Sequence, residues 1–235
     1  MATPDPVRRP VSAVLFDMDN TLFDFVEAQL FACRAILGHT GISDRDEDLF
    51  SYFRRTVHGF EHHANIRDFL SDNGAFTVRL FAECCAVYEA AKVAAIRPYP
   101  GIMHLLESLH KNGIPLAIVT DAPAVNATRR MERAGLSGYF TALVSPDQSG
   151  AAKPDPASFL LALECLGTGA EETALVGDNI RRDIAPAQRL GMVTLYAKYG
   201  DRYRSGQDAS CVPDYTAENV AEAGELLYRL TGCSG

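Results

Sequence analysis

The chain has 235 residues, 47% of them hydrophobic, and a formal net charge of −8. This composition is typical of a globular protein and argues against a disordered chain. The excess of acid argues against binding to nucleic acid or to an anionic membrane, because both need a positive field. No apolar run approaches the roughly 20 residues of a membrane-spanning helix.

The amino terminus does not have the pattern of a secretory signal, because the apolar run 11–16 is too short for the core of one. The six cysteines show no CxxC spacing and no clustering with histidine that would indicate a zinc site. We therefore expect reduced, mostly buried cysteines and a cytoplasmic location.

The first predicted strand is 13–16, four apolar residues that end at Asp17. In open α/β sheets, ligands bind at the carboxyl ends of the strands, so Asp17 would lie at a binding edge. Asp19 would point the same way if the strand continued, and two neighbouring carboxylates need a cation or a shared proton. The segment from Asp17 to Thr21 therefore predicts an active site.

The interval between Thr21 and Thr120 is more than three times longer than the roughly 30 residues of a βαβ unit. It lacks strand alternation, and its pattern predicts helices over 24–37, 47–57, 63–71 and 77–95. We therefore predict an all-helical cap domain over 23–96, which a stiff Pro- and Gly-containing segment follows. A lid inserted here could exclude water and select substrates.

The rest of the chain alternates between predicted strands and helices. Strands are expected at 114–120, 142–145, 173–177 and 192–196, and helices at 102–112, 125–134, 156–166 and 184–190. Such alternation predicts an α/β fold whose Rossmann-like core, residues 1–22 and 97–235, is a parallel sheet with helices on both faces. The smaller helical cap domain completes the predicted architecture.

Two further polar residues would come near Asp17 at the edge of this sheet. Thr120, at the end of its strand, offers a hydroxyl and backbone amides to an anion. Lys153 lies in the loop before a predicted helix and would supply local positive charge to an otherwise acidic protein.

A second acidic segment follows the predicted strand 173–177. Asp178 comes directly after Gly177, and we expect this glycine to let the backbone turn sharply at the site. Asp183 follows about one helical turn later. The sequence thus places a second group of carboxylates at the same edge.

In this order and at this spacing, the motifs resemble those of the haloacid dehalogenase superfamily of phosphohydrolases, over essentially the whole chain. The matching residues are Asp17, Asp19 and Thr21 in a DxDxT motif, Thr120, Lys153, and Gly177, Asp178 and Asp183 in a GDxxxxD motif. The helical insert looks like the family's first type of cap. The residues in and beside these motifs are similar to those of the phosphatase branch that also contains β-phosphoglucomutase-like enzymes.

The resemblance implies a Mg²⁺-dependent phosphatase that hydrolyses a small-molecule phosphomonoester through an aspartyl-phosphate. Asp17 would be the nucleophile, and Asp19 would protonate the leaving alkoxide and then take a proton from water. The metal ligands would be Asp17, Asp19 through its backbone carbonyl, and Asp178.

The same resemblance assigns supporting roles to the other motif residues. Thr120, Asp121 and Lys153 would bind the substrate phosphate, although Asp121 stands where many relatives carry asparagine. Asp183 and Thr21 would orient the groups that touch the metal and the phosphate.

Other functions stay open. A phosphomutase or a haloacid dehalogenase would share the core, but a dehalogenase has no leaving alkoxide for Asp19 to protonate. A phosphonate hydrolase would need a Schiff-base lysine, for which Lys92 is the only candidate in the insert. The non-enzyme alternative is a receiver-like phospho-switch, whose sheet domain lacks such an insert.

The expected partner is a small phosphorylated metabolite, and the oligomeric state, monomer or homodimer, is open. In the insert, His58 and His62 are four residues apart. We expect them on a solvated helix face rather than at a metal.

Overall fold

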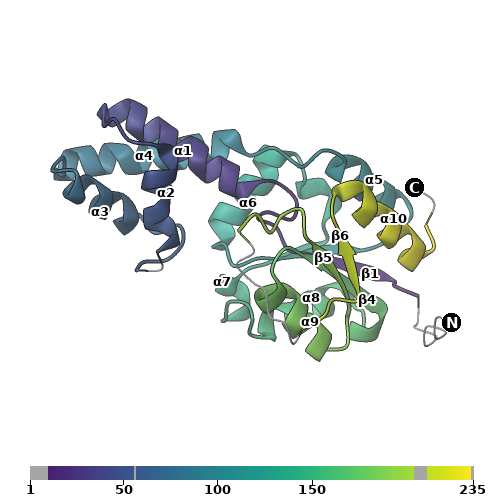
Figure 1. Cartoon of the computed structure of the whole chain (residues 1–235). Helices are drawn as coiled ribbons and strands as arrows, with labels where there is room; N and C mark the ends of the chain where they lie inside the picture. Colours follow the sequence, from purple (N-terminus) through teal and green to yellow (C-terminus); the bar gives the residue numbers. More distant parts are fainter. Residues whose placement is uncertain (1–9, 56, 204–210, 234–235) are drawn as a thin grey trace. The chain divides into compact units, whose positions relative to one another are not determined.

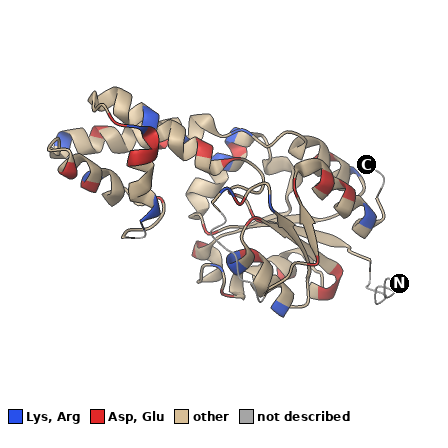
Figure 2. Cartoon of the chain, viewed as in Figure 1, with Lys and Arg blue, Asp and Glu red and all other residues tan. Residues whose placement is uncertain are grey.

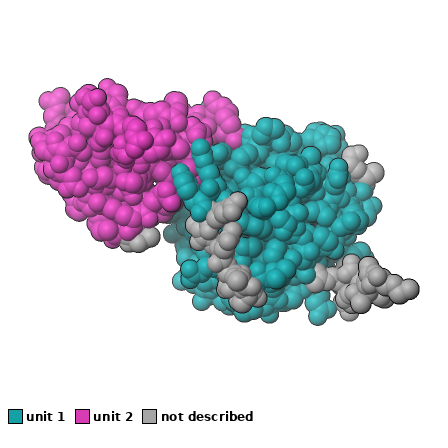
Figure 3. Space-filling view, in the orientation of Figure 1, with its two compact units in different colours: residues 1–24, 98–235 teal, residues 25–97 magenta. Residues whose placement is uncertain are grey.

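The computed structural model describes residues 10–55, 57–203 and 211–233. The chain divides into two compact units (Figure 3): unit 1 comprises residues 1–24 and 98–235, and unit 2 comprises residues 25–97. These boundaries lie within two residues of the predicted ones. Residues 1–9, 204–210 and 234–235 of the predicted core lie outside the described residues.

Unit 1 contains a six-stranded parallel sheet with the order β3-β2-β1-β4-β5-β6 (Figure 1). The strands are β1 (Ala13–Phe16), β2 (Leu116–Val119), β3 (Ala142–Val144), β4 (Thr173–Gly177), β5 (Val193–Ala197) and β6 (Tyr215–Ala217). They carry no charged residue, and the charges of Figure 2 lie on helices and loops. Because β1 lies between β2 and β4, the loops that follow these three strands meet at one edge.

Helices cover both faces of this sheet (Figure 1). One face carries α5 (Ile102–Lys111), α6 (Ala124–Ala134) and α10 (Val220–Thr231), and the other carries α8 (Ala157–Leu166) and α9 (Ala185–Arg189). On the second face, Leu15 and Leu175 of the sheet pack with Phe159 of α8 in one buried cluster. The predicted α/β class with a parallel, doubly covered sheet is confirmed.

Several elements differ from the predicted ones. The structure adds β6, α10 and the short α7 (Pro146–Ser149), together with 3₁₀ turns at Ser137–Tyr139 and Ala170–Glu172. The helix expected to begin at 184 is preceded by a π-helical turn, η3 (Ile180–Ile184). This turn begins early because the side chain of Asn179 accepts the backbone N–H groups of Arg181 and Arg182.

Unit 2 contains four helices in its described residues: α1 (Phe25–Thr40), α2 (Asp46–Arg54), α3 (Ala64–Asp72) and α4 (Val78–Ala95). Their apolar faces form one core, in which the rings of Phe53 and Tyr88 stack with centroids 5.0 Å apart. Thr77 caps α4 by accepting the N–H of Leu80. The helix α1 continues through Gly38, past the predicted end at residue 37.

Two smaller expectations about the chain are wrong. His58 and His62 are not on a helix, because they lie in the segment between α2 and α3, where His58 Nε2 is 2.9 Å from Asp68 Oδ2. All six cysteines are free, but only Cys33 and Cys84 are buried.

In the part of the chain that the structure describes, no helix has both the length and the hydrophobicity to cross a bilayer.

The two segments that lead into and out of unit 2 are joined within unit 1. Phe23 and Pro98 form an isolated antiparallel bridge. The N–H of Tyr99 donates to the carbonyl of Leu22 at 2.9 Å. The chain therefore leaves the sheet domain and returns to it at neighbouring points.

Candidate active site

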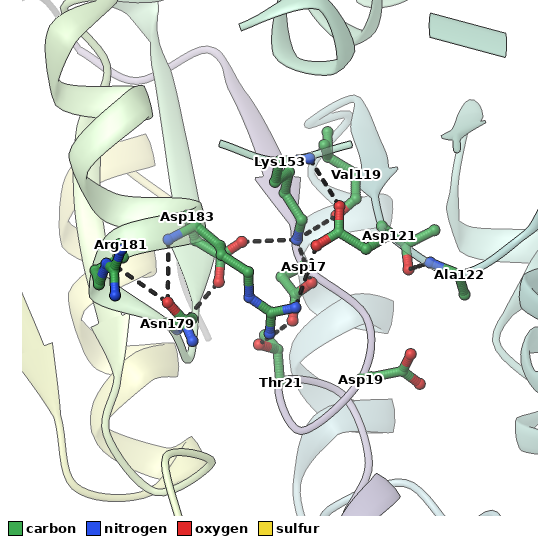
Figure 4. Close-up of polar contacts among 12 residues, drawn as sticks. Asp17, Asp19, Thr21, Val119, Asp121, Ala122, Lys153, Asn179, Arg181 and Asp183 are labelled. Carbon is green, nitrogen blue, oxygen red and sulfur yellow. Dashed lines mark hydrogen bonds and ion pairs between the residues drawn. The ribbon is translucent and has the colours of Figure 1, made fainter. Parts of the chain in front are cut away.

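Asp17 stands at the centre of the candidate site, directly after the middle strand of the sheet. Its N–H donates to the carbonyl of Val176 at 2.8 Å, which extends the pairing of β1 with β4 by one residue. Its side chain is buried, and its two oxygens accept different donors: Oδ2 accepts Thr21 Oγ1 at 2.9 Å, and Oδ1 accepts Lys153 Nζ at 2.5 Å. The carboxylate is thus fixed from both sides (Figure 4).

Lys153 is the cation at the base of the site. Its buried Nζ donates to Asp17, to Asp183 Oδ1 at 2.6 Å and to the carbonyl of Val119 at 3.1 Å. Burial acts to lower the pKa of Lys153, but the carboxylates of Asp17 and Asp183 outweigh it and raise the pKa above its ordinary value. This lysine is therefore a permanent ammonium ion that holds two acids together.

The acids of the second motif lie against Asp17. One carboxylate oxygen from each of Asp17, Asp178 and Asp183 lies within 4.8 Å of the others. Burial raises the pKa of Asp178 well above its ordinary value, and the charges of Asp17 and Asp183 add to this shift. Burial also raises the pKa of Asp183 to about 6. The cluster carries more negative charge than one lysine can balance.

This cluster fits a hard divalent cation. Asp178 Oδ1 is buried and has no hydrogen-bond partner among the described residues. An acceptor left in that state costs free energy unless a cation or water completes it. Carboxylate oxygens are the ligands that Mg²⁺ takes from proteins. Asp183 differs from Asp178, because its Oδ1 accepts Lys153 and its Oδ2 accepts the N–H of Asn179.

Gly177 is needed for close packing. Its φ lies outside the left-handed region, so this glycine is not required for a left-handed backbone, and the expected sharp turn stays a prediction. A Cβ at this position would lie 2.6 Å from the Cβ of Asp183 and 2.9 Å from its Oδ2. Glycine therefore lets the π-helical turn bring Asp183 directly against the end of β4.

Asp19 points away from the acid cluster (Figure 4). Its Oδ2 accepts Nη1 of Arg130 at 2.6 Å, and its side chain is 21% exposed. The next residue, Asn20, has a φ of 64°, a conformation that asparagine tolerates better than most residues. This turn separates the carboxylate of Asp19 from that of Asp17.

Thr120 and Asp121 organise the loop after β2. Thr120 is buried, and its hydroxyl accepts the N–H of Ala122 at 3.1 Å. Asp121 Oδ1 accepts the N–H of Lys153 at 2.8 Å, and its Oδ2 accepts Nη1 of Arg182 at 3.2 Å. Asp121 therefore links the loop after β2 to the loops that carry Lys153 and Arg182. Its contact with phosphate stays a prediction.

Sequence reasoning missed several residues of the site. Arg182 pairs with Asp121, and although burial acts to lower its pKa, Asp183 and Asp17 raise it. Arg130 and Gly200 reach the first motif from α6 and from the loop after β5. The sequence offered one signal for these residues: Arg130 lies on the apolar face of the predicted helix 125–134, where an arginine is unusual.

The family follows from a comparison with known proteins. The model of the haloacid dehalogenase-like hydrolases matches residues 11–191, and the chain belongs to this family. It is 31% identical to a glyceraldehyde 3-phosphate phosphatase of Methanopyrus kandleri, over 94% of this chain and 98% of that one. It is 30% identical to a phosphoglycolate phosphatase of Neisseria meningitidis, over 92% and 94%.

A solved structure shows the breadth of the fold. The 2-haloacid dehalogenase of Pseudomonas syringae is 27% identical, with a TM-score of 0.66, over 93% of this chain and 99% of that one. The curated relatives nevertheless act on phosphorylated metabolites. The chain is therefore a phosphoric monoester hydrolase of the haloacid dehalogenase-like family.

Proposed function

We propose that the chain is a Mg²⁺-dependent phosphatase that hydrolyses a small phosphomonoester through an aspartyl-phosphate on Asp17. The observation that carries this proposal is the buried carboxylate cluster of Asp17, Asp178 and Asp183, in which one oxygen of Asp178 has no hydrogen-bond partner among the described residues. Asp17 and Asp178 would hold the ion together with the backbone carbonyl of Asp19. When bound, Mg²⁺ offsets the carboxylate repulsion and the charge of the transferring phosphoryl group.

The first half of the reaction uses Asp17 as the nucleophile. Thr21 and Lys153 hold its two oxygens, so the orientation of the carboxylate is fixed before the substrate binds. A bond forms between a carboxylate oxygen and phosphorus, and the bond from phosphorus to the substrate alkoxide breaks. Asp19 enters this half in its protonated form, with Oδ2 still accepting Arg130, and gives its proton to the leaving alkoxide.

The second half regenerates the acid. Water attacks the phosphorus of the aspartyl-phosphate and gives its proton to Asp19, and inorganic phosphate leaves as Asp17 becomes free. Lys153 neutralises the transferring phosphoryl oxygens, and Thr120 donates its hydroxyl to them, because its own backbone N–H is taken by the carbonyl of Val144. Asp183 keeps the ammonium group of Lys153 in place throughout.

The test is phosphate release from a panel of metabolites that includes glyceraldehyde 3-phosphate and phosphoglycolate. We expect release that requires Mg²⁺, is abolished by a chelator and is lost in Asp17→Asn. Asp44→Asn, an exposed acid of unit 2, is the matched control and should retain full activity. Metal-independent release that persists in Asp17→Asn contradicts the nucleophile assignment.

The same preparations separate the alternatives. Halide release from a 2-haloacid identifies a dehalogenase, and phosphate exchange between two positions of a sugar identifies a mutase. A stable aspartyl-phosphate without turnover identifies a phospho-switch. Borohydride trapping tests for a Schiff base on Lys92, and we expect none, because Glu61 and Glu89 accept hydrogen bonds from its Nζ at 2.8 and 2.9 Å.

A further inference from the structure

Arg130 is a charged residue in a position that normally carries an apolar one. It lies on the buried face of α6, at helical spacing from Ala127, Met131 and Ala134, and it is 1% exposed. It ranks first in volume among the fully buried side chains. The neighbouring Arg129 is exposed, as is usual for an arginine on a surface helix.

A buried guanidinium ion is expensive to keep. An ion pair offsets only part of the free-energy cost of its desolvation. Replacing a buried ion pair by apolar side chains is therefore often neutral or stabilising. Packing alone therefore does not account for an arginine on the core stripe of α6. Arg130 contacts Asp19 in the loop after β1: Nη1 donates to Oδ2 at 2.6 Å, between residues 111 positions apart.

The geometry of this pair is asymmetric. The side chain of Arg130 is 1% exposed and fixed in the core, whereas that of Asp19 is 21% exposed. Asp19 follows β1 in a loop whose next residue has a left-handed backbone. The rigid helix thus holds the carboxylate of a loop residue, and a planar guanidinium restricts its orientation more than a single point charge would.

We propose that Arg130 is a positioning residue for Asp19, and this rests on the proposed function of Asp19 as the acid and base. Arg130 holds the carboxylate where it can reach the leaving oxygen in the first half of the reaction and the attacking water in the second. It touches neither substrate nor metal. Its contribution to turnover passes entirely through Asp19.

The leaving group provides a readout that a purely structural role does not move. An alkyl phosphate needs a proton on its leaving oxygen, whereas p-nitrophenyl phosphate does not. In Arg130→Gln we expect kcat for glycerol phosphate to fall about 100-fold with KM nearly unchanged. With p-nitrophenyl phosphate, we expect a burst of p-nitrophenol at close to the wild-type rate, followed by slow turnover, because only the second half still needs Asp19.

The controls use the same helix and the same acid. Arg129→Gln should behave as wild type, and Arg130→Lys, which keeps the charge but loses the planar fork, should recover part of the activity. In an Asp19→Ala background, Arg130→Gln should add no further loss. A further loss in that background, or an equal fall for both leaving groups with raised KM, overturns the proposal.

Folding and function are separated by urea denaturation of each variant. If Arg130→Lys and Arg130→Gln are both unfolded, the arginine is a structural requirement and the positioning role is wrong. If the wild-type chain releases no phosphate with Mg²⁺, the proposed function fails, whatever the Arg130 variants do. If the wild type is active and the leaving-group difference is absent, only the positioning role fails.

Discussion

Replacing Gly200 by alanine should disable the site without replacing any of its acids. The loop that contains Gly200 packs against the loop after β1: the hydroxyl of Tyr199 donates to the carbonyl of Thr21 at 3.0 Å. A Cβ on Gly200 would lie 1.9 Å from the carbonyl oxygen of Asn20 and 3.0 Å from the Cβ of Asp178. The clash is with a backbone carbonyl, which cannot move aside by changing rotamer as a side chain can.

The size of the effect follows from these distances. The carbonyl of Asn20 would have to retreat by about 1 Å, and overpacking of this kind costs about 1–3 kcal/mol. For a chain of this length, each kcal/mol lowers the melting temperature by roughly 2–4 °C. A shift of about 1 Å at a catalytic loop lowers the rate about 100-fold. We therefore expect a loss of several degrees and of about two orders of magnitude in kcat.

The assay is Mg²⁺-dependent phosphate release together with thermal unfolding. Gly169→Ala is the matched control, because a Cβ there meets no atom within 4 Å and the φ of −85° suits alanine. If Gly200→Ala is as active and as stable as Gly169→Ala, the loop after β5 does not hold the first motif in place, and the reasoning is wrong.

Two further predictions concern charge. Since burial raises the folded-state pKa of Asp183 to about 6 and that of Asp178 well above its ordinary value, the metal-free fold is favoured by protonation. In the presence of a chelator, the melting temperature should fall as the pH rises from 5 to 7, and the fall should be less steep in Asp183→Asn. Added Mg²⁺ should counter the fall. A melting temperature that does not change with pH contradicts this prediction. In unit 2, Lys92 lies over the ring of Tyr88 at 4.5 Å with its stem buried. Urea unfolding should show a loss of about 2–4 kcal/mol for Lys92→Ala but much less for Lys92→Met, and equal losses would exclude packing of the stem as the cause.

The sequence was sufficient for features that depend on local pattern. The apolar run that ends at Asp17 and the glycine before Asp178 lie at the same edge of the sheet, because all strands of a parallel sheet end at one edge. Lys153 could be placed there for the same reason. Its two carboxylate partners could not be read from the spacing alone, since loop geometry decides them.

Other features depend on contacts between distant parts of the chain. The place of Arg130 on an apolar stripe of α6 marks it as unusual, but it does not show that its partner is Asp19, 111 residues away. Gly200 lies in a turn after β5, but no local pattern shows that it must also leave space for the carbonyl of Asn20. The strand Tyr215–Ala217 has three residues and an exposed threonine at its centre, so it lacks the continuous apolar run by which 142–145 was recognised.

The bridge between Phe23 and Pro98 has a practical consequence for how such enzymes can diversify. Since the chain departs and re-enters at adjacent positions, whole helical inserts can be exchanged, shortened or transplanted while the strand order of the host is preserved. Grafting the 25–97 segment onto a related scaffold would therefore show which of the two units determines substrate specificity and which carries out catalysis.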